Sequence, residues 1–402
     1  MKTLLFVGGG RHQRRGILRA RELGHRVVAV DRKPDAPGML AADVAEPVDF
    51  SDVDAVIEVA RRHGVDGAMT VSADRAVPVV AAIAEALGLP GIGPDVAHAM
   101  THKVVMRRLF ADHGVPQPRF AAVHGLHDSR VAAETVGFPA VLKPASSGGQ
   151  RGIYRLESAD DLDAHLHAAL AESPTQEAIL EEFTEGLELN GIAVVRDGEV
   201  TVLTLSDRLR PEGPGFGVGW IHVYPTTLFG DALAEAERVA AHSVRALGLE
   251  NGIAFPQLIA KPSGEVVAVE VAARIPGGQM ADVVREGTGV ELLDIAILQA
   301  FGEPVPDAVV TPSRSQPLAV RFLTAEPGPL PAGTVTGYSG LERVRAFPGV
   351  VQAEVYFTVG ETIRPVRLDG DRRGYVLATG ATNLEALERA EAAARLLDVE
   401  VE

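Results

Sequence analysis

Residues 251–278 read NGIAFPQLIAKPSGEVVAVEVAARIPGG, and this stretch decides the fold that we expect. Two apolar segments of strand length flank the turn KPSG, a pattern that predicts a pair of antiparallel strands. Such a pair brings Gln257 and Glu270 onto neighbouring strands, where both side chains could face one metal ion. The sequence therefore predicts an oxygen-ligand metal site on this hairpin.

Glu270 is unusual because it interrupts a segment that is otherwise apolar and buried. A buried carboxylate costs several kcal/mol unless it is paired with a cation. The alternative is a hairpin with one buried Glu–Arg pair, formed with Arg274. A bound cation is the simpler interpretation, and Arg274 would then place a fixed positive charge beside a phosphoryl group.

Two lysines upstream are candidate phosphate ligands. Lys143 leaves an apolar strand in FPAVLKPASSGGQRG, and the glycines of the following loop let backbone N–H groups approach the same phosphates. A surface hairpin with a solvated lysine is the alternative. Lys103, in THKVVMRRLFADHG, lies on an amphipathic helix, where one lysine more often marks a solvated face.

An acidic strand end, AILEEF, follows the second lysine. The carboxylates of Glu181 and Glu182, beside Phe183, could accept hydrogen bonds from a base or a ribose. Glu188 follows a probable turn, so the sequence leaves open whether it contacts a ribose or solvent.

Candidate substrate contacts lie in SDRLRPEGPGFGVGWIHVYP, whose Gly and Pro content indicates a loop over an acceptor site. Arg208, Trp220 and His222 are the candidates, although the only tryptophan could equally pack in a core and His222 could be exposed. Gly277 and Gly278 offer backbone N–H groups to a substrate carboxylate, or they form a strand-to-helix turn.

The organisation of the chain is α/β followed by α+β. Strands and helices alternate up to the Gly/Pro cluster GLPGIGPD, which predicts a parallel α/β domain over residues 1–95. We expect one helix from Pro94 to His113, and with it a small subdomain over 96–180. A mainly antiparallel sheet that includes AILEEF should occupy 181–305, and a small C-terminal cap ending in a helix should occupy 306–402.

Composition narrows the function. The net charge of −16 argues against sequence-independent binding to nucleic acid or to anionic membranes. The chain has no cysteine, so disulfides, thiolate metal sites and a cysteine nucleophile are excluded. The N-terminal apolar run breaks at three glycines and is expected to be a buried strand, with cytoplasmic localisation as the default. Gly8, Gly9 and Gly10 do not form a dinucleotide fingerprint.

Over nearly its whole length the chain resembles the ATP-grasp superfamily, through VLKPASSGGQRG, LEEFTEGLE and VEVAARIPGG. The EVAAR ending, TGYSGLERVRAFPGV and RGYVLATG look most like the L-amino-acid ligases that make dipeptides. The resemblance implies a pre-ATP-grasp domain, a two-subdomain ATP-grasp fold and a capping domain. It also implies ATP and Mg²⁺ as cofactors.

Carried over by position, the resemblance implies roles for individual residues. Arg274 and Lys143 would act on the transferred phosphoryl group, and Glu270 and Gln257 would hold Mg²⁺. The nucleotide ligands would be Lys103, Lys143, Ser146, Ser147, Gly148, Gly149, Gln150, Gly152, Glu181, Glu182, Phe183 and Glu188. The substrate contacts would be Arg274, Gly277, Gly278, Trp220, His222 and Arg208.

Two positions depart from the family pattern. Gln257 stands where the first metal ligand is usually Glu, and Ala272 stands where many members have Asn, which puts the number of metal ions in doubt. The expected function is an ATP-dependent carboxylate–amine ligase that forms an acyl phosphate, with small carboxylates and amines, amino acids among them, as substrates. A purine-type carboxylase or formyl-transferring synthetase and a non-catalytic ATP-binding regulator are the alternatives. A homodimer is the expected assembly.

Overall fold

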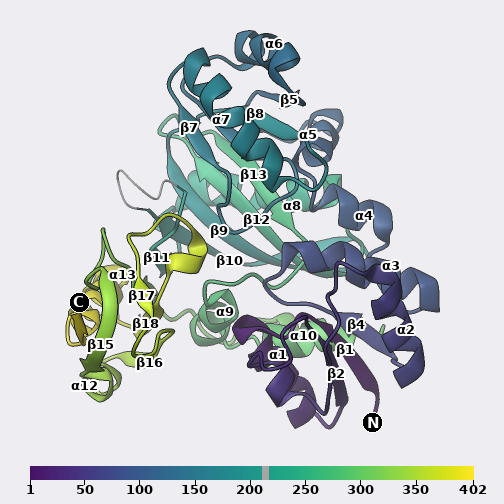
Figure 1. Cartoon of the computed structure of the whole chain (residues 1–402), viewed down its shortest axis with the longest axis vertical. Coiled ribbons are helices and arrows are strands. Elements are labelled where there is room, and N and C mark those ends of the chain that lie inside the picture. Colours follow the sequence, from purple (N-terminus) through teal and green to yellow (C-terminus); the bar gives the residue numbers. More distant parts are fainter. Residues whose placement is uncertain (211–216) are drawn as a thin grey trace.

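The computed structural model describes residues 1–210 and 217–402. It has lobes at the N-terminal, middle and C-terminal parts of the chain, arranged around a long central sheet (Figure 1). Within the described residues, no helix has both the length and the apolar character needed to cross a membrane.

The N-terminal lobe is a parallel sheet with strand order β3-β2-β1-β4, covered by helices. Its strands are short apolar runs, and a glycine segment leads from the first strand into the first helix, as the sequence predicts. The elements are β1 (Thr3–Val7), α1 (Arg11–Glu22), β2 (Arg26–Val30), β3 (Val44–Glu46), α2 (Val53–His63), β4 (Gly67–Met69) and α3 (Val77–Leu87).

The single helix expected from Pro94 to His113 is wrong: the structure has two helices, α4 (Pro94–Ala99) and α5 (Lys103–Asp112). His102 between them is extended, and the backbone N–H of Lys103 donates to the carbonyl of Ala145 at 2.8 Å. The break therefore ties the first turn of α5 to the strand that carries Lys143.

The upper lobe in Figure 1 is a small antiparallel sheet with strand order β5-β8-β6-β7. Its elements are β5 (Phe120–Val123), α6 (Leu126–Val136), β6 (Ala140–Pro144), β7 (Tyr154–Leu156), α7 (Ala159–Glu172) and β8 (Ala178–Glu182). The strand AILEEF, β8, pairs with β5 and β6 in this lobe. The expectation that this strand belongs to the central sheet is wrong, because β8 completes the small sheet before the chain enters the central sheet.

The central sheet has strand order β13-β12-β9-β10-β11-β14-β18-β16. Its first five strands in chain order are β9 (Leu187–Arg196), β10 (Glu199–Leu209), β11 (Ile221–Tyr224), β12 (Gly252–Ala260) and β13 (Val266–Ala272). One face packs on α8 (Gly230–Ala246) and α5 through a buried cluster that includes Leu189, Val239 and Leu258. The other face packs on α9 (Met280–Thr288), α10 (Leu292–Ala300) and the N-terminal lobe.

The C-terminal residues extend the central sheet beyond β11, so the sheet runs across residue 306, where we expected a separate cap to begin. The elements of the C-terminal residues are α11 (Asp307–Val310), β14 (Leu318–Phe322), β15 (Gly333–Ser339), α12 (Leu341–Arg345), β16 (Val350–Val355), β17 (Thr362–Ile363), β18 (Gly374–Thr379), α13 (Asn383–Ala394) and β19 (Asp398–Val401). The last element is thus a strand and not the expected helix. The four-unit division of the chain remains a prediction.

Candidate active site

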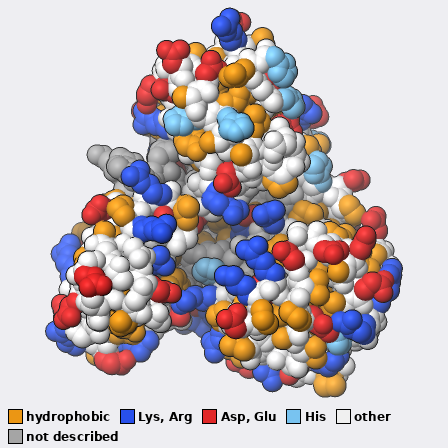
Figure 2. All heavy atoms as spheres, in the orientation of Figure 1, with side chains coloured by type: hydrophobic (Ala, Val, Ile, Leu, Met, Phe, Trp, Pro, Cys, Tyr) orange, Lys and Arg blue, Asp and Glu red, His pale blue; other side chains and the backbone are white. Residues whose placement is uncertain are grey.

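The three lobes surround a central hollow, and Figure 2 shows Lys and Arg side chains gathered around it although the chain carries a net charge of −16. The candidate site begins at this hollow and runs under the upper lobe. Local positive charge of this kind attracts anionic ligands irrespective of the net charge.

Lys103 and Lys143 both reach the space between the upper lobe and the central sheet. The Nζ of Lys103 lies 3.0 Å from Glu270 Oε1 and donates to the carbonyl of Ser147 at 3.0 Å. The Nζ of Lys143 lies 2.6 Å from Glu181 Oε2. Both lysine side chains are nearly buried, with 8% and 12% of their surface exposed. The solvated-face alternatives are therefore wrong for both lysines.

Glu181 forms the most deeply buried ionic contact of the site. Its carboxylate accepts from Arg107 Nε at 2.8 Å as well as from Lys143, and Arg107 also donates to the carbonyl of Ala268 at 2.7 Å. Burial alone would raise the pKa of Glu181, but the charges and hydrogen bonds of Arg107 and Lys143 lower it to about 2. The carboxylate therefore stays ionised and holds Lys143 and α5 in place.

A β-bulge places Glu270 in the site. Gln257 on β12 lies opposite Glu270 on β13, whereas the next pair is Leu258 with Ala268, so Val269 is the extra residue. Strict alternation would put Glu270 on the same face as Val266 and Ala268, in the cluster under α8. Because the bulge reverses the alternation, Glu270 and Gln257 both line the cavity beneath the upper lobe.

These two side chains fit a magnesium ion held largely by nucleotide phosphates. Glu270 supplies one carboxylate and Gln257 one amide carbonyl, and Mg²⁺ commonly takes only one or two protein ligands beside phosphate oxygens and water. No group of three or more carboxylate or imidazole side chains suited to a metal occurs among the described residues. A cage made of protein ligands alone is thus not present in that part of the chain.

Arg274 is held by Asp74 in a two-pronged ion pair. Its Nε and Nη2 lie 2.6 and 2.7 Å from the two carboxylate oxygens. Burial alone would lower the pKa of Arg274, but the Asp74 charge raises it, and the same pair lowers the pKa of Asp74. The remaining nitrogen, Nη1, is buried with no hydrogen-bond partner among the described residues. A permanently charged, oriented guanidinium therefore stands beside the lysine and carboxylate of the site.

The loop between β6 and β7, residues 145–153, contacts three parts of the molecule. An added Cβ at Gly148 would lie 2.6 Å from Asp74 Oδ2, and one at Gly217 would lie 2.4 Å from Gln150 Oε1. The carbonyl of Gly149 accepts from the backbone N–H of Asp369 at 3.3 Å. The loop thus lies over the Asp74–Arg274 pair and touches the C-terminal lobe.

The other predicted loop residues lie nearby. The carbonyl of Ser147 is bound by Lys103, as described, and the backbone N–H of Ser146 is 3.4 Å from Ser173 Oγ. Gly152 has a φ of 68°, and an added Cβ there would lie 2.8 Å from Pro144. Glycine is therefore required at Gly152 for the loop to return to β7.

The predicted adenine and ribose residues meet at the far end of the same cavity. Arg155 lies over the ring of Phe183, with 4.2 Å from its guanidinium carbon to the ring centre. Glu188 lies inside the cavity, ion-paired with Arg208 and, at 2.7 Å, with Arg210. The structure thereby decides the face of Glu188 that the sequence left open.

The backbone around Glu182 is already engaged. The N–H of Glu182 donates to the Arg119 carbonyl at 2.9 Å and that of Phe183 to the Pro139 carbonyl at 3.1 Å. The cavity measures about 100 Å³, whereas small-molecule sites usually measure about 300–1,000 Å³. A nucleotide bound here would therefore need more space than this cavity offers.

The predicted substrate residues are only partly brought together. Gly278 adjoins His222, since an added Cβ would lie 3.3 Å from the imidazole Cε1, and Gly277 adjoins Ser72. His222 is buried, and burial together with Arg372 and Arg208 holds its pKa well below the usual value. The exposed alternative for His222 is therefore wrong.

Trp220 lies elsewhere. Arg321 stacks on its ring at 4.5 Å, and both pack on the face of the sheet that α13 covers, opposite to His222. The core-packing alternative fits this placement. Residues 211–216 of the expected acceptor loop lie outside the described residues.

Three site residues were missed by sequence reasoning: Arg107, Asp74 and Arg210. Arg107 follows Lys103 by one helical turn, so both project from one face of α5, and this spacing was an available signal. Asp74 lies in the N-terminal lobe, far from Arg274 in sequence, and no local pattern pairs the two.

Comparison with known proteins identifies the family of the chain. A family model described as carbamoyl-phosphate synthase L chain, ATP binding domain matches residues 102–308, more than half of the chain. Models described as ATP-grasp N-terminal domain and L-amino acid ligase C-terminal domain 2 match residues 18–91 and 321–402.

Full-length relatives are also similar. The formate-dependent phosphoribosylglycinamide formyltransferase of Synechococcus sp. (strain RCC307) is 28% identical over 406 residues, which cover 99% of this chain and 98% of that protein. The enzyme of the same name from Ignicoccus hospitalis is 29% identical over 410 residues, covering 98% and 95%.

Solved structures share the fold. The L-amino acid ligase from Bacillus licheniformis has a TM-score of 0.86 at 23% identity, covering 100% of this chain and 99% of that one. The N5-carboxyaminoimidazole ribonucleotide synthetase from Thermotoga maritima has a TM-score of 0.78 at 21% identity, covering 100% of both. Residues 102–308 thus belong to the family of the carbamoyl-phosphate synthase L chain, ATP binding domain, and the chain is an enzyme of the ATP-grasp superfamily of ligases.

Proposed function

We propose that this enzyme joins a small carboxylate, an amino acid in the first instance, to an amine through an acyl phosphate, with release of ADP and phosphate. One observation carries the proposal. Lys103 and Lys143 come from two separate segments and Glu270 and Arg274 from a third, and all four converge beneath one glycine loop. Cations around a space closed by a loop suit transfer of a phosphoryl group, in which positioning and charge stabilisation supply most of the catalysis.

In the first step, a carboxylate oxygen of the substrate attacks the γ-phosphorus of ATP. The bond between that phosphorus and the β–γ bridging oxygen breaks, and ADP leaves. Lys103 and Lys143 would exchange their carboxylate partners for phosphate oxygens, and Arg274 would bind the developing negative charge. Mg²⁺ bound by Glu270 and Gln257 would supply further neutralisation of the phosphates.

In the second step, an amine attacks the acyl carbon, the carbon–oxygen bond to phosphate breaks, and the amine loses a proton. Until then the acyl phosphate must be kept from water. The loop of residues 145–153, which already touches Asp74 and the C-terminal lobe, is placed to do this.

Carboxylates offset part of the positive charge of the arginines around the central hollow, which leaves a place for the ammonium group of an amino acid. Each of three already has a carboxylate partner: Arg15 is bound by Asp282, Arg372 by Asp369 at 2.9 Å, and Arg11 by Glu354 at 3.7 Å. Arg14, which lines the same cavity as Arg11 and Arg15, has no ion-pair partner among the described residues and is available to a substrate carboxylate. The match of residues 321–402 to the L-amino acid ligase C-terminal domain 2 supports the same choice.

The names of the full-length relatives favour a second candidate, formate-dependent formyl transfer to phosphoribosylglycinamide. The two candidates are separated by the substrates that trigger ADP and phosphate release. We expect pairs of L-amino acids to give equal amounts of ADP and phosphate, and formate with phosphoribosylglycinamide to give none. Release with the latter pair alone would replace the first proposal by the second.

The site itself is tested by Lys143→Ala and Glu270→Ala, which should each abolish the release. Lys261→Ala, which removes a surface lysine paired with Glu265, is the matched control and should leave it unchanged. Robust turnover in both site variants would contradict the proposed site. Binding of ATP with no turnover under any substrate mixture would indicate a non-catalytic regulator. The homodimer stays a prediction for light scattering to test.

A further inference from the structure

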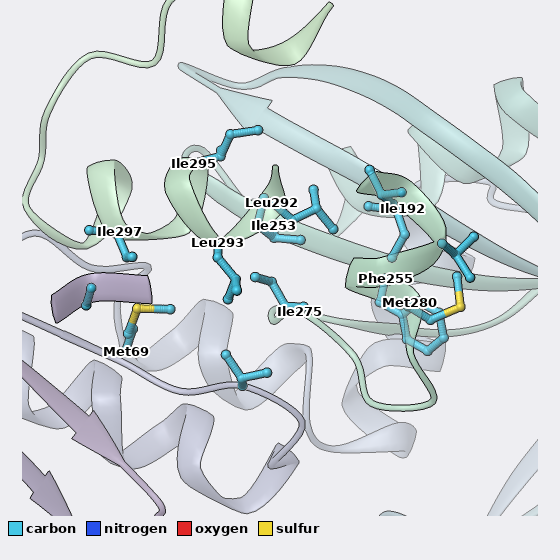
Figure 3. Close-up of a cluster of buried hydrophobic side chains, with 14 of the residues drawn as sticks. Met69, Ile192, Ile253, Phe255, Ile275, Met280, Leu292, Leu293, Ile295 and Ile297 are labelled. Atoms are coloured by element: carbon cyan, nitrogen blue, oxygen red, sulfur yellow. The ribbon is translucent and has the colours of Figure 1, made fainter. Parts of the chain in front are cut away.

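The cavity that Arg14 lines measures about 220 Å³ and lies between helix α1, helices α9 and α10, and strands β16 and β18. Figure 3 shows Ile275, Met280 and Leu293, three of its lining residues, which come from separate segments of the chain. Because Ile275 directly follows Arg274, the cavity adjoins the proposed reaction centre. Its volume is below the range of drug-sized ligands, about 300–1,000 Å³, and suits a smaller ligand such as a single amino acid.

A buried hydroxyl group without a partner lies in the wall of this cavity. Tyr375 lines the cavity and is 1% exposed, and its hydroxyl makes no hydrogen bond among the described residues. The neighbouring tyrosine differs, because the hydroxyl oxygen of Tyr356 accepts from Gln279 Nε2 at 2.7 Å. An unpaired buried hydroxyl is unfavourable in the free protein, and a ligand that brings an acceptor to it recovers that free energy.

Two lining residues hold a backbone conformation that is rare outside glycine. Ser72 and Gln279 both have a φ of 61°, in the left-handed region. Conformations of this kind persist only where the surroundings fix them, and they concentrate at ligand-binding sites. The hydrogen bond to Tyr356 fixes Gln279 in this way, so this side of the cavity is formed before a ligand enters.

The charges at the mouth of the cavity leave one arginine uncompensated. Three arginines and two carboxylates line the cavity, which leaves one positive charge in excess: Arg11, Arg14, Arg15, Asp282 and Glu354. Asp282 is bound by Arg15, and Glu354 lies 3.7 Å from Arg11. Arg14 is exposed and has no partner of this kind within the described ranges. One singly charged anionic group, such as the α-carboxylate of an amino acid, matches this excess.

The surroundings of Tyr375 favour a neutral group. Burial raises the pKa of Tyr375, and the negative charges of Asp282 and Glu354 raise it further, so the hydroxyl stays protonated and can donate. The same two charges repel a carboxylate at this place. A primary amide fits, because its carbonyl accepts from the hydroxyl and its NH₂ group can donate to a carboxylate.

We propose that this cavity binds an amino acid with an amide side chain, glutamine in the first instance, with its α-carboxylate on Arg14 and its side-chain carbonyl on the Tyr375 hydroxyl. The inference rests on the proposed function, since it names the class of amino acid that the ligation would use. Tyr375 is then a specificity-determining residue, because an apolar side chain of similar length leaves its hydroxyl buried and unpaired.

Calorimetric titration without nucleotide tests the site. We expect L-glutamine to bind at least five-fold more tightly than L-norleucine, which is of similar length, and than L-glutamate. Tyr375→Phe removes only the hydroxyl, and should weaken glutamine about five-fold and leave norleucine within two-fold. This hydroxyl has no partner in the free chain, so the variant is expected to fold. Tyr338→Phe, at a tyrosine that is 40% exposed, is the matched control and should change neither affinity.

The carboxylate end is tested separately. Arg14→Gln should weaken glutamine and norleucine alike, about five-fold, because both carry the α-carboxylate. Arg130→Gln, at an exposed arginine of α6, is its control and should weaken neither. Three results would overturn the proposal: no saturable binding of glutamine, equal affinity of the unchanged protein for glutamine and norleucine, or a Tyr375→Phe variant that weakens both or neither.

Failure of the proposed function gives a different result. Glutamine that binds as expected, but that releases no ADP and phosphate with any second amino acid, would contradict the ligase and leave the glutamine site standing. Release with other pairs of amino acids, together with no preference for glutamine in the titration, would contradict the glutamine site alone.

Discussion

Replacing Glu181 with glutamine should expose how strongly the nucleotide site depends on one buried carboxylate. Glu181 is 2% exposed and is bound by both Arg107 and Lys143. Its pKa of about 2, against an ordinary value of 4.5, corresponds to roughly 3 kcal/mol of stabilisation at pH 7. Removing one partner of a buried ion pair generally costs about 3–5 kcal/mol, which is consistent. We expect Glu181→Gln to lower the unfolding temperature by roughly 4 °C, because the unfolding entropy of a chain of 402 residues is large.

The pH dependence has a definite sign. Because the pKa is lower in the folded chain, the stabilisation is fully present above about pH 4.5 and is lost as the pH falls towards 2. At pH 3.5 the difference in unfolding free energy between wild type and Glu181→Gln should be smaller than at pH 7 by about 1 kcal/mol. Urea unfolding followed by circular dichroism measures the unfolding free energy of both proteins at both pH values. The other carboxylates contribute equally to both proteins, so their contribution drops out of the difference.

The neighbouring residue supplies the control. Glu182 pairs with Arg119 at 3.2 Å, but water reaches this pair, with 38% of the Glu182 side chain and 63% of that of Arg119 exposed. Glu182→Gln should therefore change the unfolding free energy by less than about 1 kcal/mol at either pH. A difference below about 1 kcal/mol for Glu181→Gln at pH 7, or one that does not shrink at pH 3.5, would refute the reasoning.

Two further predictions concern the loop and the buried histidine. Gly148→Ala should lower phosphate release more than ten-fold, since its Cβ would displace Asp74 from Arg274. Gly337→Ala, whose Cβ would lie 3.3 Å from a flexible Glu400 side chain, is the control, and equal loss in both variants would count against the prediction. Burial lowers the pKa of His222, so its imidazole should be neutral where an ordinary histidine titrates, and its contribution to stability should fall as the pH drops below the ordinary value of about 6.5. A His222 imidazole signal, assigned by comparison with His222→Gln, that titrates between pH 6 and 8 would contradict this.

Much of the fold could be read from local patterns. Alternating apolar strands and amphipathic helices predicted the parallel N-terminal sheet, and the KPSG hairpin was paired as expected, with Gln257 opposite Glu270. Such features depend on residues that are near one another in sequence, where propensity and periodicity act directly. Local patterns gave the wrong prediction at α4 and α5, because the break between these helices is stabilised by a hydrogen bond to Ala145, which is distant in the sequence.

By itself, then, the sequence determined most of the strands and helices and which segments carry the charged groups. Only the tertiary structure decided which of those groups meet. The bulge at Val269 turns Glu270 towards the site, Asp74 reaches Arg274 from another lobe, and Trp220 is turned to the opposite face of the sheet from His222. The reason is physical: a one-residue shift in strand register reverses the side of every following side chain, and contacts between distant segments leave no trace in local periodicity.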